Sequence, residues 1–165
     1  MIRTERLILR GARMEDLDDV HAMLSHPAAM RYWAHPEHAT VAESLKWLEG
    51  MVKAASEIDF VIEHQGRVIG KAGAWRLPEV GFMLHPDHWG KGLAHEAMAA
   101  VIAHLFAAPE VDELTADVDP RNAASLRLLG RLGFVETGRA ERTLKWRDEW
   151  CDSVYLALKR PDGNA

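Results

Sequence analysis

A strand-like apolar run that passes into a helix through a glycine-rich loop is the feature that most constrains the fold of this chain. Residues 79–84 read EVGFML, Pro86 ends the run, and residues 89–94 read WGKGLA. From residue 94 to 107, apolar side chains recur every three or four positions, as on the buried face of a helix. Glycine takes positive φ and lets other groups approach the backbone closely. We therefore expect a bare backbone turn at the beginning of a helix, beside a buried strand.

That turn predicts an anion site. The first turn of a helix carries unpaired N–H groups and a partial positive charge. Backbone N–H groups from Gly90 to Ala94 would hold phosphates, and Lys91 would add a cation. A tight turn with a glycine N-cap fits the same residues equally well. Two common phosphate motifs do not fit, because Gly92 stands where a P-loop needs Ser or Thr and His95 stands where the Rossmann fingerprint needs a third glycine.

The remaining patterns place strands and helices along the whole chain. Alternation and apolar periodicity predict strands at 6–10, 59–63, 68–75, 79–84, 113–118, 134–138 and 153–159, and helices at 12–26, 40–52, 94–107 and 122–132. Some strands pair locally as hairpins, while helices follow others. We therefore predict a mixed α/β sheet with helices on both faces rather than a regular doubly wound fold.

Length and composition narrow the class of protein. A chain of 165 residues is one domain by length. The formal net charge of −5 argues against a general nucleic-acid binder. Cys151 is the single cysteine, which excludes an internal disulfide and a cysteine metal cluster. The first ten residues carry no signal-peptide pattern and nowhere do about 18 apolar residues run together, so we expect a cytoplasmic protein without a membrane span.

Four motifs resemble those of one enzyme family. WGKGLA (89–94) resembles the pyrophosphate-binding motif Q/R-x-x-G-x-G/A of the GNAT acetyltransferases, with Trp89 in its first slot. TERLILR (4–10), NAASLRLLGRLGF (122–134) and EWCDSVYLALK (149–159) resemble the opening strand, the N-x-x-S…LGF motif and the closing strand of the RimJ/RimL-like (ribosomal-protein-alanine N-acetyltransferase-like) branch. The resemblance implies a single N-acetyltransferase domain at 1–160, followed by a flexible tail at 161–165.

The resemblance also implies a mechanism. A GNAT fold has a mixed, mostly antiparallel sheet that is splayed between its central strands, here 79–84 and the strand near 113–118. Acetyl-CoA would be the cosubstrate, and its acetyl group would pass to a primary amine in a ternary complex, without an acyl-enzyme. The pantetheine arm would pair with strand 79–84, where an N–H of Met83 or Leu84 would hold the thioester oxygen. The cofactor-binding residues that we expect are Met83, Leu84, His85, His88, Trp89, Gly90, Lys91, Gly92, Leu93, Ala94, Asn122 and Ser125.

Two side chains are our candidates for catalysis. An alkyl ammonium with a pKa of about 10 must lose a proton before it attacks the thioester. Glu79, at the start of strand 79–84, is the candidate base, and a solvated strand-end carboxylate fits it equally well. The tyrosine that many GNAT enzymes use for the leaving thiolate is absent, because Leu129 occupies its position. Ser125 is therefore the candidate thiol partner, and local helix capping is its alternative role. Asn122 would bind the pantetheine and also serve as an N-cap.

The acceptor side is less defined by the sequence. Tyr32 and Trp33 follow the first helix, where the acceptor-side loops of the family lie, and we expect them to touch the acceptor. The acceptor would be a protein N-terminus or a small amine, and members of this branch are often homodimers. His85 and His88 flank the glycine loop, but their spacing matches no standard zinc pattern, so we expect no metal.

Three other functions remain open at this point. A non-catalytic acyl-CoA-binding or sensing module would need the same glycine loop without Glu79 or Ser125. A generic nucleotide-phosphate binder would also use the loop, and would accept ATP as well as acetyl-CoA. An α/β interaction domain would need the glycines only for a turn.

Overall fold

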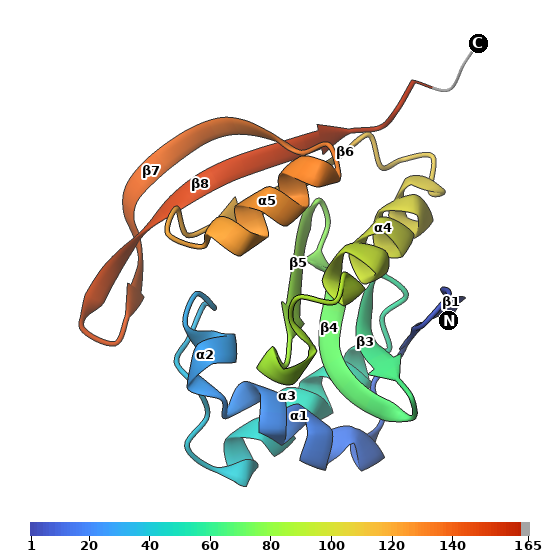
Figure 1. Ribbon diagram of the computed structural model, residues 1–165, viewed down its shortest axis with the longest axis vertical. Coiled ribbons are helices and arrows are strands. Elements are labelled where there is room, and N and C mark those ends of the chain that lie inside the picture. The colour runs from blue at the N-terminus through green and yellow to red at the C-terminus, as the bar shows by residue number, and fades with distance from the viewer. Residues whose placement is uncertain (163–165) are drawn as a thin grey trace.

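The computed structural model describes residues 1–162, in which one eight-stranded sheet carries helices on both faces (Figure 1). Of the expected flexible tail, residues 163–165 lie outside this description. The strands are β1 (Ile2–Arg3), β2 (Ile8–Arg10), β3 (Asp59–His64), β4 (Arg67–Arg76), β5 (Glu79–Leu84), β6 (Glu113–Val118), β7 (Val135–Trp146) and β8 (Glu149–Lys159). The helices are α1 (Leu17–Leu24), α2 (Pro27–Met30), α3 (Val41–Ala54), α4 (Leu93–Phe106) and α5 (Ala123–Arg131), with 3-10 turns η1 (Met14–Asp16) and η2 (Pro86–His88).

The sheet is held together antiparallel except at its centre. Its strand order is β1-β2-β3-β4-β5-β6-β8-β7, and only β5 and β6 run parallel. These two strands pair at a single bridge, Glu79 with Thr115, where the Thr115 N–H donates to the Pro78 carbonyl at 2.9 Å. Beyond this bridge no further register is formed between them in the described chain. The predicted mixed, mostly antiparallel sheet with splayed central strands is therefore confirmed.

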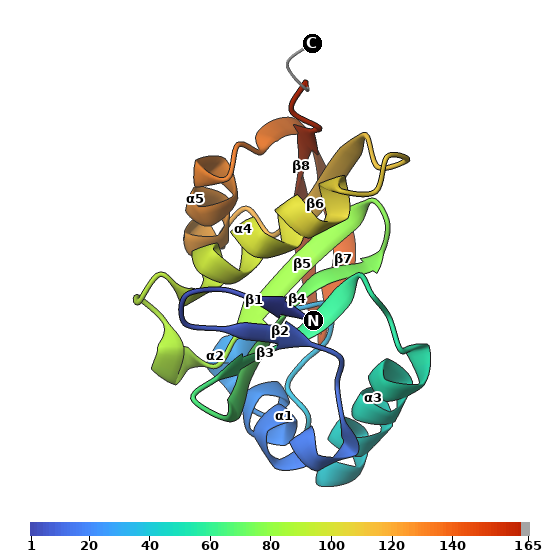
Figure 2. The same cartoon turned by 90° about the vertical axis from the view of Figure 1, so that its right-hand side faces the viewer.

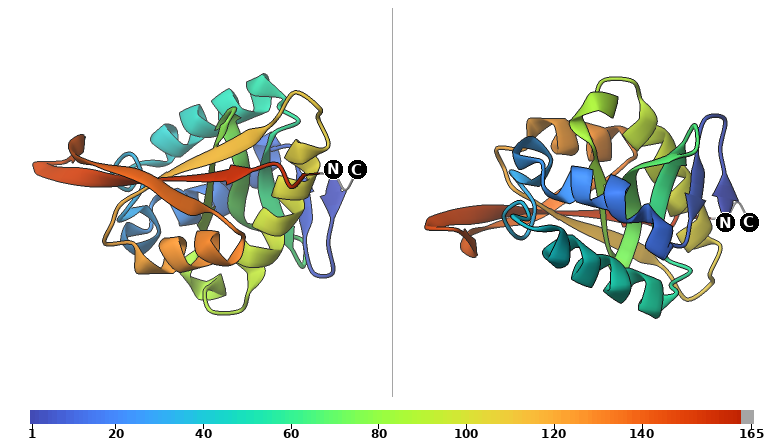
Figure 3. Two further views of the ribbon diagram at one scale, coloured as in Figure 1. Left: turned by 90° about the horizontal axis from the view of Figure 1, so that it is seen from above. Right: turned by 90° about the horizontal axis from the view of Figure 1, so that it is seen from below.

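Two apolar clusters attach the helices to opposite faces of the sheet (Figure 3). Met98 of α4 and Leu129 of α5 belong to one cluster, together with much of the sheet. Val20 of α1 and Leu48 of α3 belong to the other cluster, which includes Met83 of β5. Because residues alternate along a strand, one face of β5 contacts each cluster. Within residues 1–162, no helix has the length and apolar character needed to cross a membrane.

The hairpin of β7 and β8 is longer than its sequence pattern predicts. We expected strands at 134–138 and 153–159, whereas the structure has them at Val135–Trp146 and Glu149–Lys159. Most of β7 is exposed or half-buried, so it shows no clear alternation of apolar and polar residues. In Figure 1 the hairpin extends past α5 and curves above α2. Its outer part forms one wall of the cavity described below.

Candidate active site

The loop between β5 and α4 has the bare backbone that the sequence predicts. Gly90 and Gly92 adopt φ of 73° and 76°, in the left-handed region that favours glycine. Gly92 is the N-cap of α4, so the first turn of that helix follows directly. Within the described chain, the N–H groups from Gly90 to Ala94 have no hydrogen-bond acceptor. The loop and the helix therefore present a row of donors and a helix dipole to an anion.

A clamp from the N-terminal segment holds this loop in place, and sequence reasoning missed it. The Arg6 guanidinium donates to Glu96 at 2.7 Å and to the Lys91 carbonyl at 2.9 Å. The Thr4 hydroxyl donates to the same Glu96 carboxylate at 2.6 Å. Figure 2 shows the β1–β2 hairpin lying beside the first turn of α4. The clamp fixes one side of the loop and neutralises the only acidic side chain in that first turn.

The pKa of Glu96 reflects this clamp. Burial alone would raise it, but the hydrogen bonds from Thr4 and from the backbone and side chain of Arg6 more than offset burial, so the net pKa is below its ordinary value. Glu96 therefore stays ionised and paired at neutral pH. Its charge is directed at Arg6 and does not repel an anion held by the loop.

Histidines border the loop without forming a metal site. Burial lowers the pKa of His88, and the nearby Lys91, His64 and His85 lower it further, so the imidazole is neutral near pH 7. The His88 Nδ1 is buried without a hydrogen-bond partner in the described chain. His85 accepts the Asp87 N–H at 3.1 Å and so caps η2. Among residues 1–162, no three His, Cys, Asp or Glu side chains are grouped to hold a metal ion.

The backbone N–H and C=O groups of β5 point alternately toward β4 and toward the gap that separates β5 from β6 beyond their single bridge. The His85 N–H donates to the Ile69 carbonyl of the neighbouring strand β4 at 2.7 Å, so the His85 backbone faces the β4 side. Opposed residues of an antiparallel pair alternate between hydrogen-bonded and non-hydrogen-bonded positions. This alternation turns Met83 toward β4 as well, and turns Phe82 and Leu84 toward β6. Met83 and His85 therefore use their backbone groups for β4, whereas Phe82 and Leu84 present theirs to the gap.

Trp89 connects the loop to this strand. Its indole N–H donates to the Leu84 carbonyl at 2.9 Å, across the end of β5. The contact occupies the Leu84 carbonyl and leaves the Leu84 N–H and both backbone groups of Phe82 facing the gap. Trp89 thus anchors the glycine loop to the last residue of β5.

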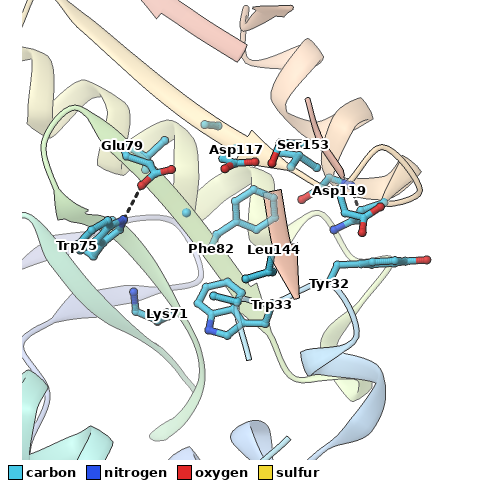
Figure 4. A pocket seen from close by; sticks show the side chains of 18 of the residues that line it. Tyr32, Trp33, Lys71, Trp75, Glu79, Phe82, Asp117, Asp119, Leu144 and Ser153 are labelled. Carbon is cyan, nitrogen blue, oxygen red and sulfur yellow. Dashed lines mark hydrogen bonds between the residues drawn. The ribbon is translucent and has the colours of Figure 1, made fainter. Parts of the chain in front are cut away.

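A cavity of about 720 Å³ begins in that opening and continues to the opposite face of the sheet. Its lining comes from the loop after α2, from α3, β3, β4, β5, β6 and α5, and from the β7–β8 hairpin, and includes Trp33, Glu79, Phe82, Asp117, Ser125 and Ser153. Figure 4 shows Phe82 and Leu144 near its centre and carboxylates along its upper side. The cavity is therefore open to α5 on one face of the sheet and to α3 on the other.

Both predicted catalytic side chains line this cavity. Glu79 accepts the indole N–H of Trp75 at 2.8 Å (Figure 4). Ser125 lies in the first turn of α5, where its N–H donates to the Asn122 side chain at 3.3 Å. The Ser125 hydroxyl has no partner among the described residues, so Asn122 alone provides the cap. Leu129, one turn further on, is buried and also lines the cavity.

Tyr32 and Trp33, which we expect to touch the acceptor, line the cavity, and an ionic network supports Tyr32. Arg121 pairs with Asp119 at 2.7 Å and also with Glu149, which in turn pairs with Arg31 at 3.2 Å. The Arg31 guanidinium lies 5.3 Å from the Tyr32 ring centroid. The network joins α2, the β6–α5 loop and β8 at the cavity mouth. Sequence patterns gave no signal for it, because its members are far apart along the chain.

The comparisons with known proteins agree with this geometry. The family model of the acetyltransferase (GNAT) domain matches residues 6–135. The spermidine N(1)-acetyltransferase of Escherichia coli K12 is 28% identical over 159 residues, which is 91% of this chain and 84% of that protein. The [ribosomal protein uS5]-alanine N-acetyltransferase of the same strain is 33% identical over 90 residues, covering 54% of this chain and 46% of that protein.

A solved structure supports the same fold. The acetyltransferase (GNAT family) from Bacillus anthracis superposes with a TM-score of 0.83 at 23% identity, covering 96% of this chain and 97% of that one. The predicted resemblance to the GNAT enzymes and their RimJ/RimL-like relatives is thus confirmed. This chain belongs to the GNAT acetyltransferase family, and it is an N-acetyltransferase whose donor is acetyl-CoA.

Proposed function

We propose that this protein transfers the acetyl group of acetyl-CoA directly to a primary amine, with both substrates bound at once. The observation that carries the proposal is the single bridge between β5 and β6. It leaves a gap between the two strands, and the cavity in this gap is lined by Phe82 and reaches the Glu79 carboxylate. A thioester arm in this gap would meet an amine that enters from the α3 side of the cavity.

The cofactor would bind along a continuous path. The diphosphate would accept hydrogen bonds from the N–H groups of Gly90–Ala94, and the Lys91 ammonium would approach it. The pantetheine arm would follow β5 like an added strand, using the open backbone groups of Phe82 and Leu84. Asn122 would contact the same arm from α5. His88 would pack beside the cofactor as a neutral imidazole.

The chemistry would then need three groups. Glu79 takes a proton from the ammonium, directly or through water, and the amine nitrogen attacks the thioester carbon. An N–H of β5, from Phe82 or Leu84, stabilises the negative charge on the thioester oxygen, a contribution of about 3–4 kcal/mol per donor in measured cases. The carbon–sulfur bond breaks, the attacking nitrogen loses its second proton, and this proton passes to the departing thiolate, to which the Ser125 hydroxyl donates a hydrogen bond. Products are the acetylated amine and free CoA.

An amine panel tests the reaction. Peptides with free N-termini, polyamines, aminoglycosides and amino acids are offered with acetyl-CoA while the release of free thiol is followed. We expect thiol release above the hydrolysis background with at least one class, and initial-rate patterns that intersect, as a ternary complex requires. If acetyl-CoA binds and no amine in the panel releases thiol, the protein is a sensing module instead.

Thermal unfolding tests the cofactor site. Acetyl-CoA at 100 times its Kd stabilises the protein by about 2.7 kcal/mol through mass action, or about 5–10 °C for a domain of this size. ATP at the same concentration should give a much smaller shift, because it lacks the pantetheine arm. Gly92→Ala should weaken the binding of acetyl-CoA about tenfold. Alanine at positive φ costs about 1–2 kcal/mol, and the loop would rotate to relieve this strain. An equal shift with ATP would instead indicate a generic nucleotide-phosphate site.

A further inference from the structure

The part of the cavity lined by Trp33, Asp59, Lys71, Glu79 and Phe82 is called the acceptor chamber here. Its buried lysine has more N–H donors than acceptors among the described residues. Lys71 of β4 is only 6% exposed, and its Nζ lies 2.9 Å from the Asp59 Oδ1. An ammonium carries three N–H donors. Among the described residues, Asp59 is its only ion-pair partner, and no hydrogen bond is formed from the Nζ, since the Asp59 Oδ1 itself has no hydrogen-bond partner. A buried charge with unused donors is costly, so the site calls for another oxygen.

The strand register opens the chamber at this lysine. Gly73 of β4 lies opposite Asp59 of β3 on one side and Gly81 of β5 on the other. Gly81 has no side chain to fill the space beside Trp33, and a Cβ added there would lie 4.0 Å from the Trp33 ring. A Cβ at Gly73 would instead clash with the Ile58 carbonyl and the Asp59 backbone, so Gly73 lets β3 and β4 approach closely. The Lys71 Nζ lies 6.0 Å from the centroid of that ring. Figure 4 shows Lys71 and Trp33 together on the lower side of the cavity, across from Glu79.

The two sides of the chamber differ in charge. Glu79 and Asp117 lie on the upper side, and neither makes an ion pair with the residues that the structure describes. This side attracts the ammonium of an acceptor. On the lower side, Lys71 and Asp59 together are neutral, which favours an uncharged oxygen there over a carboxylate. Trp33 and Phe82 supply an apolar surface between the two sides.

We infer that Lys71 is a specificity residue, which binds a neutral hydrogen-bond-accepting oxygen of the acceptor while the acceptor's amine lies at Glu79. The inference rests on the proposed function and deepens it. The acceptor is then an amine that carries an amide carbonyl or a hydroxyl, rather than a purely cationic polyamine. A site that is built to bind such an oxygen discriminates strongly against an analogue that lacks it, because the buried donor then stays unpaired.

Two matched amines test this role. L-leucinamide and 3-methylbutylamine share one carbon skeleton, and only the first carries a carboxamide. With acetyl-CoA saturating, kcat/KM is measured for each amine by thiol release, using wild type, Lys71→Met and the double variant Lys71→Met/Asp59→Asn. We expect both variants to lower the leucinamide to 3-methylbutylamine ratio by about 10- to 100-fold, the range for a hydrogen bond to a charged group. The loss should appear in KM for leucinamide.

The comparison of ratios cancels the intrinsic reactivity of the two amines. Lys46→Met is the matched control, since Lys46 is exposed on α3, and it should leave the ratio unchanged. The double variant avoids an unpaired buried carboxylate, and Lys71→Arg retains a cation and should keep part of the preference. Unfolding midpoints of all variants report whether the fold is intact.

Four outcomes overturn the inference. Lys71→Met could lower kcat/KM equally for both amines, which would make the Lys71–Asp59 pair purely structural. It could also leave both values unchanged. Wild type could acetylate spermidine or 3-methylbutylamine and not leucinamide, in which case the proposed function stands and the oxygen site does not. If no amine releases thiol, the proposed function fails first and the inference fails with it.

Discussion

Replacing Glu79 with glutamine should lower kcat by about 10²- to 10⁴-fold, the range that positioned proton transfer contributes. Glutamine keeps the shape of the side chain, and its carbonyl oxygen can still accept the Trp75 indole N–H that Glu79 accepts at 2.8 Å. It cannot take a proton from the ammonium. Because an alkyl ammonium has a pKa of about 10, only a small fraction of the amine is deprotonated at neutral pH without a base.

The pH profile separates a lost base from lost binding. The rate of the Glu79→Gln variant should rise continuously with pH toward the pKa of the free amine, and KM for acetyl-CoA should stay near the wild-type value. Glu113→Gln, at an exposed position on β6, is the control and should behave as wild type. Asp117 lies near Glu79 in the chamber (Figure 4). If Asp117→Asn causes the large loss and Glu79→Gln does not, Asp117 is the base.

Ser125→Ala gives a second reading of the same assignment. Loss of one hydrogen bond to the departing thiolate should cost about 1.5–3 kcal/mol, or roughly 10- to 100-fold in kcat. The helix should remain intact, because Asn122 and not the Ser125 hydroxyl caps α5. Turnover that survives both Glu79→Gln and Ser125→Ala would show that neither residue has its proposed role.

Local patterns were enough to predict most of the fold. Helix α4 follows from apolar spacing, and its glycine N-cap follows from two glycines in a strand-to-helix junction. The 3-10 start before α1 and the short α2 were not predicted, because four-residue turns leave no periodic signal. The outer part of β7 was missed for a related reason. No side chain of β7 is fully buried, so its sequence lacks the alternation of apolar and polar residues that identifies a strand. Its pairing with β8 stabilises it instead.

The site was predicted less completely than the fold. Gly90, Gly92, Glu79 and Ser125 belong to contiguous motifs. The structure gives both glycines the expected positive φ and places Glu79 and Ser125 in one cavity. Pairs formed between distant segments left no trace in the sequence. Arg6 reaches Glu96 across 90 residues, and Lys71 reaches Asp59 across a strand pair. Which backbone groups of β5 face the gap also depends on its register with β4, which no single-strand pattern specifies.

Gly70→Ala should strongly destabilise the sheet. A Cβ at Gly70 would lie 2.2 Å from the Met83 carbonyl oxygen and 3.2 Å from the Leu84 Cα. Both are backbone atoms of β5, so no side chain can turn away to make room. The two strands must separate, and we expect the free energy of unfolding to fall by about 3 kcal/mol or more. Chemical denaturation measures the loss of free energy. In thermal unfolding, the midpoint should drop by about 6–12 °C.

The same substitution should also weaken the binding of acetyl-CoA. Pushing Met83 away from Gly70 moves β5 toward the gap in which Phe82 and Leu84 would bind the pantetheine arm. Folded Gly70→Ala protein should therefore bind acetyl-CoA more weakly than wild type. Gly50→Ala is the matched control, because Gly50 lies exposed within α3 with nothing near its Cβ position, and alanine there should stabilise the protein by about 0.5–1 kcal/mol. Wild-type stability and affinity in Gly70→Ala would mean that β4 does not fix the position of β5, and the gap would then lack the rigid edge that the proposed mechanism requires.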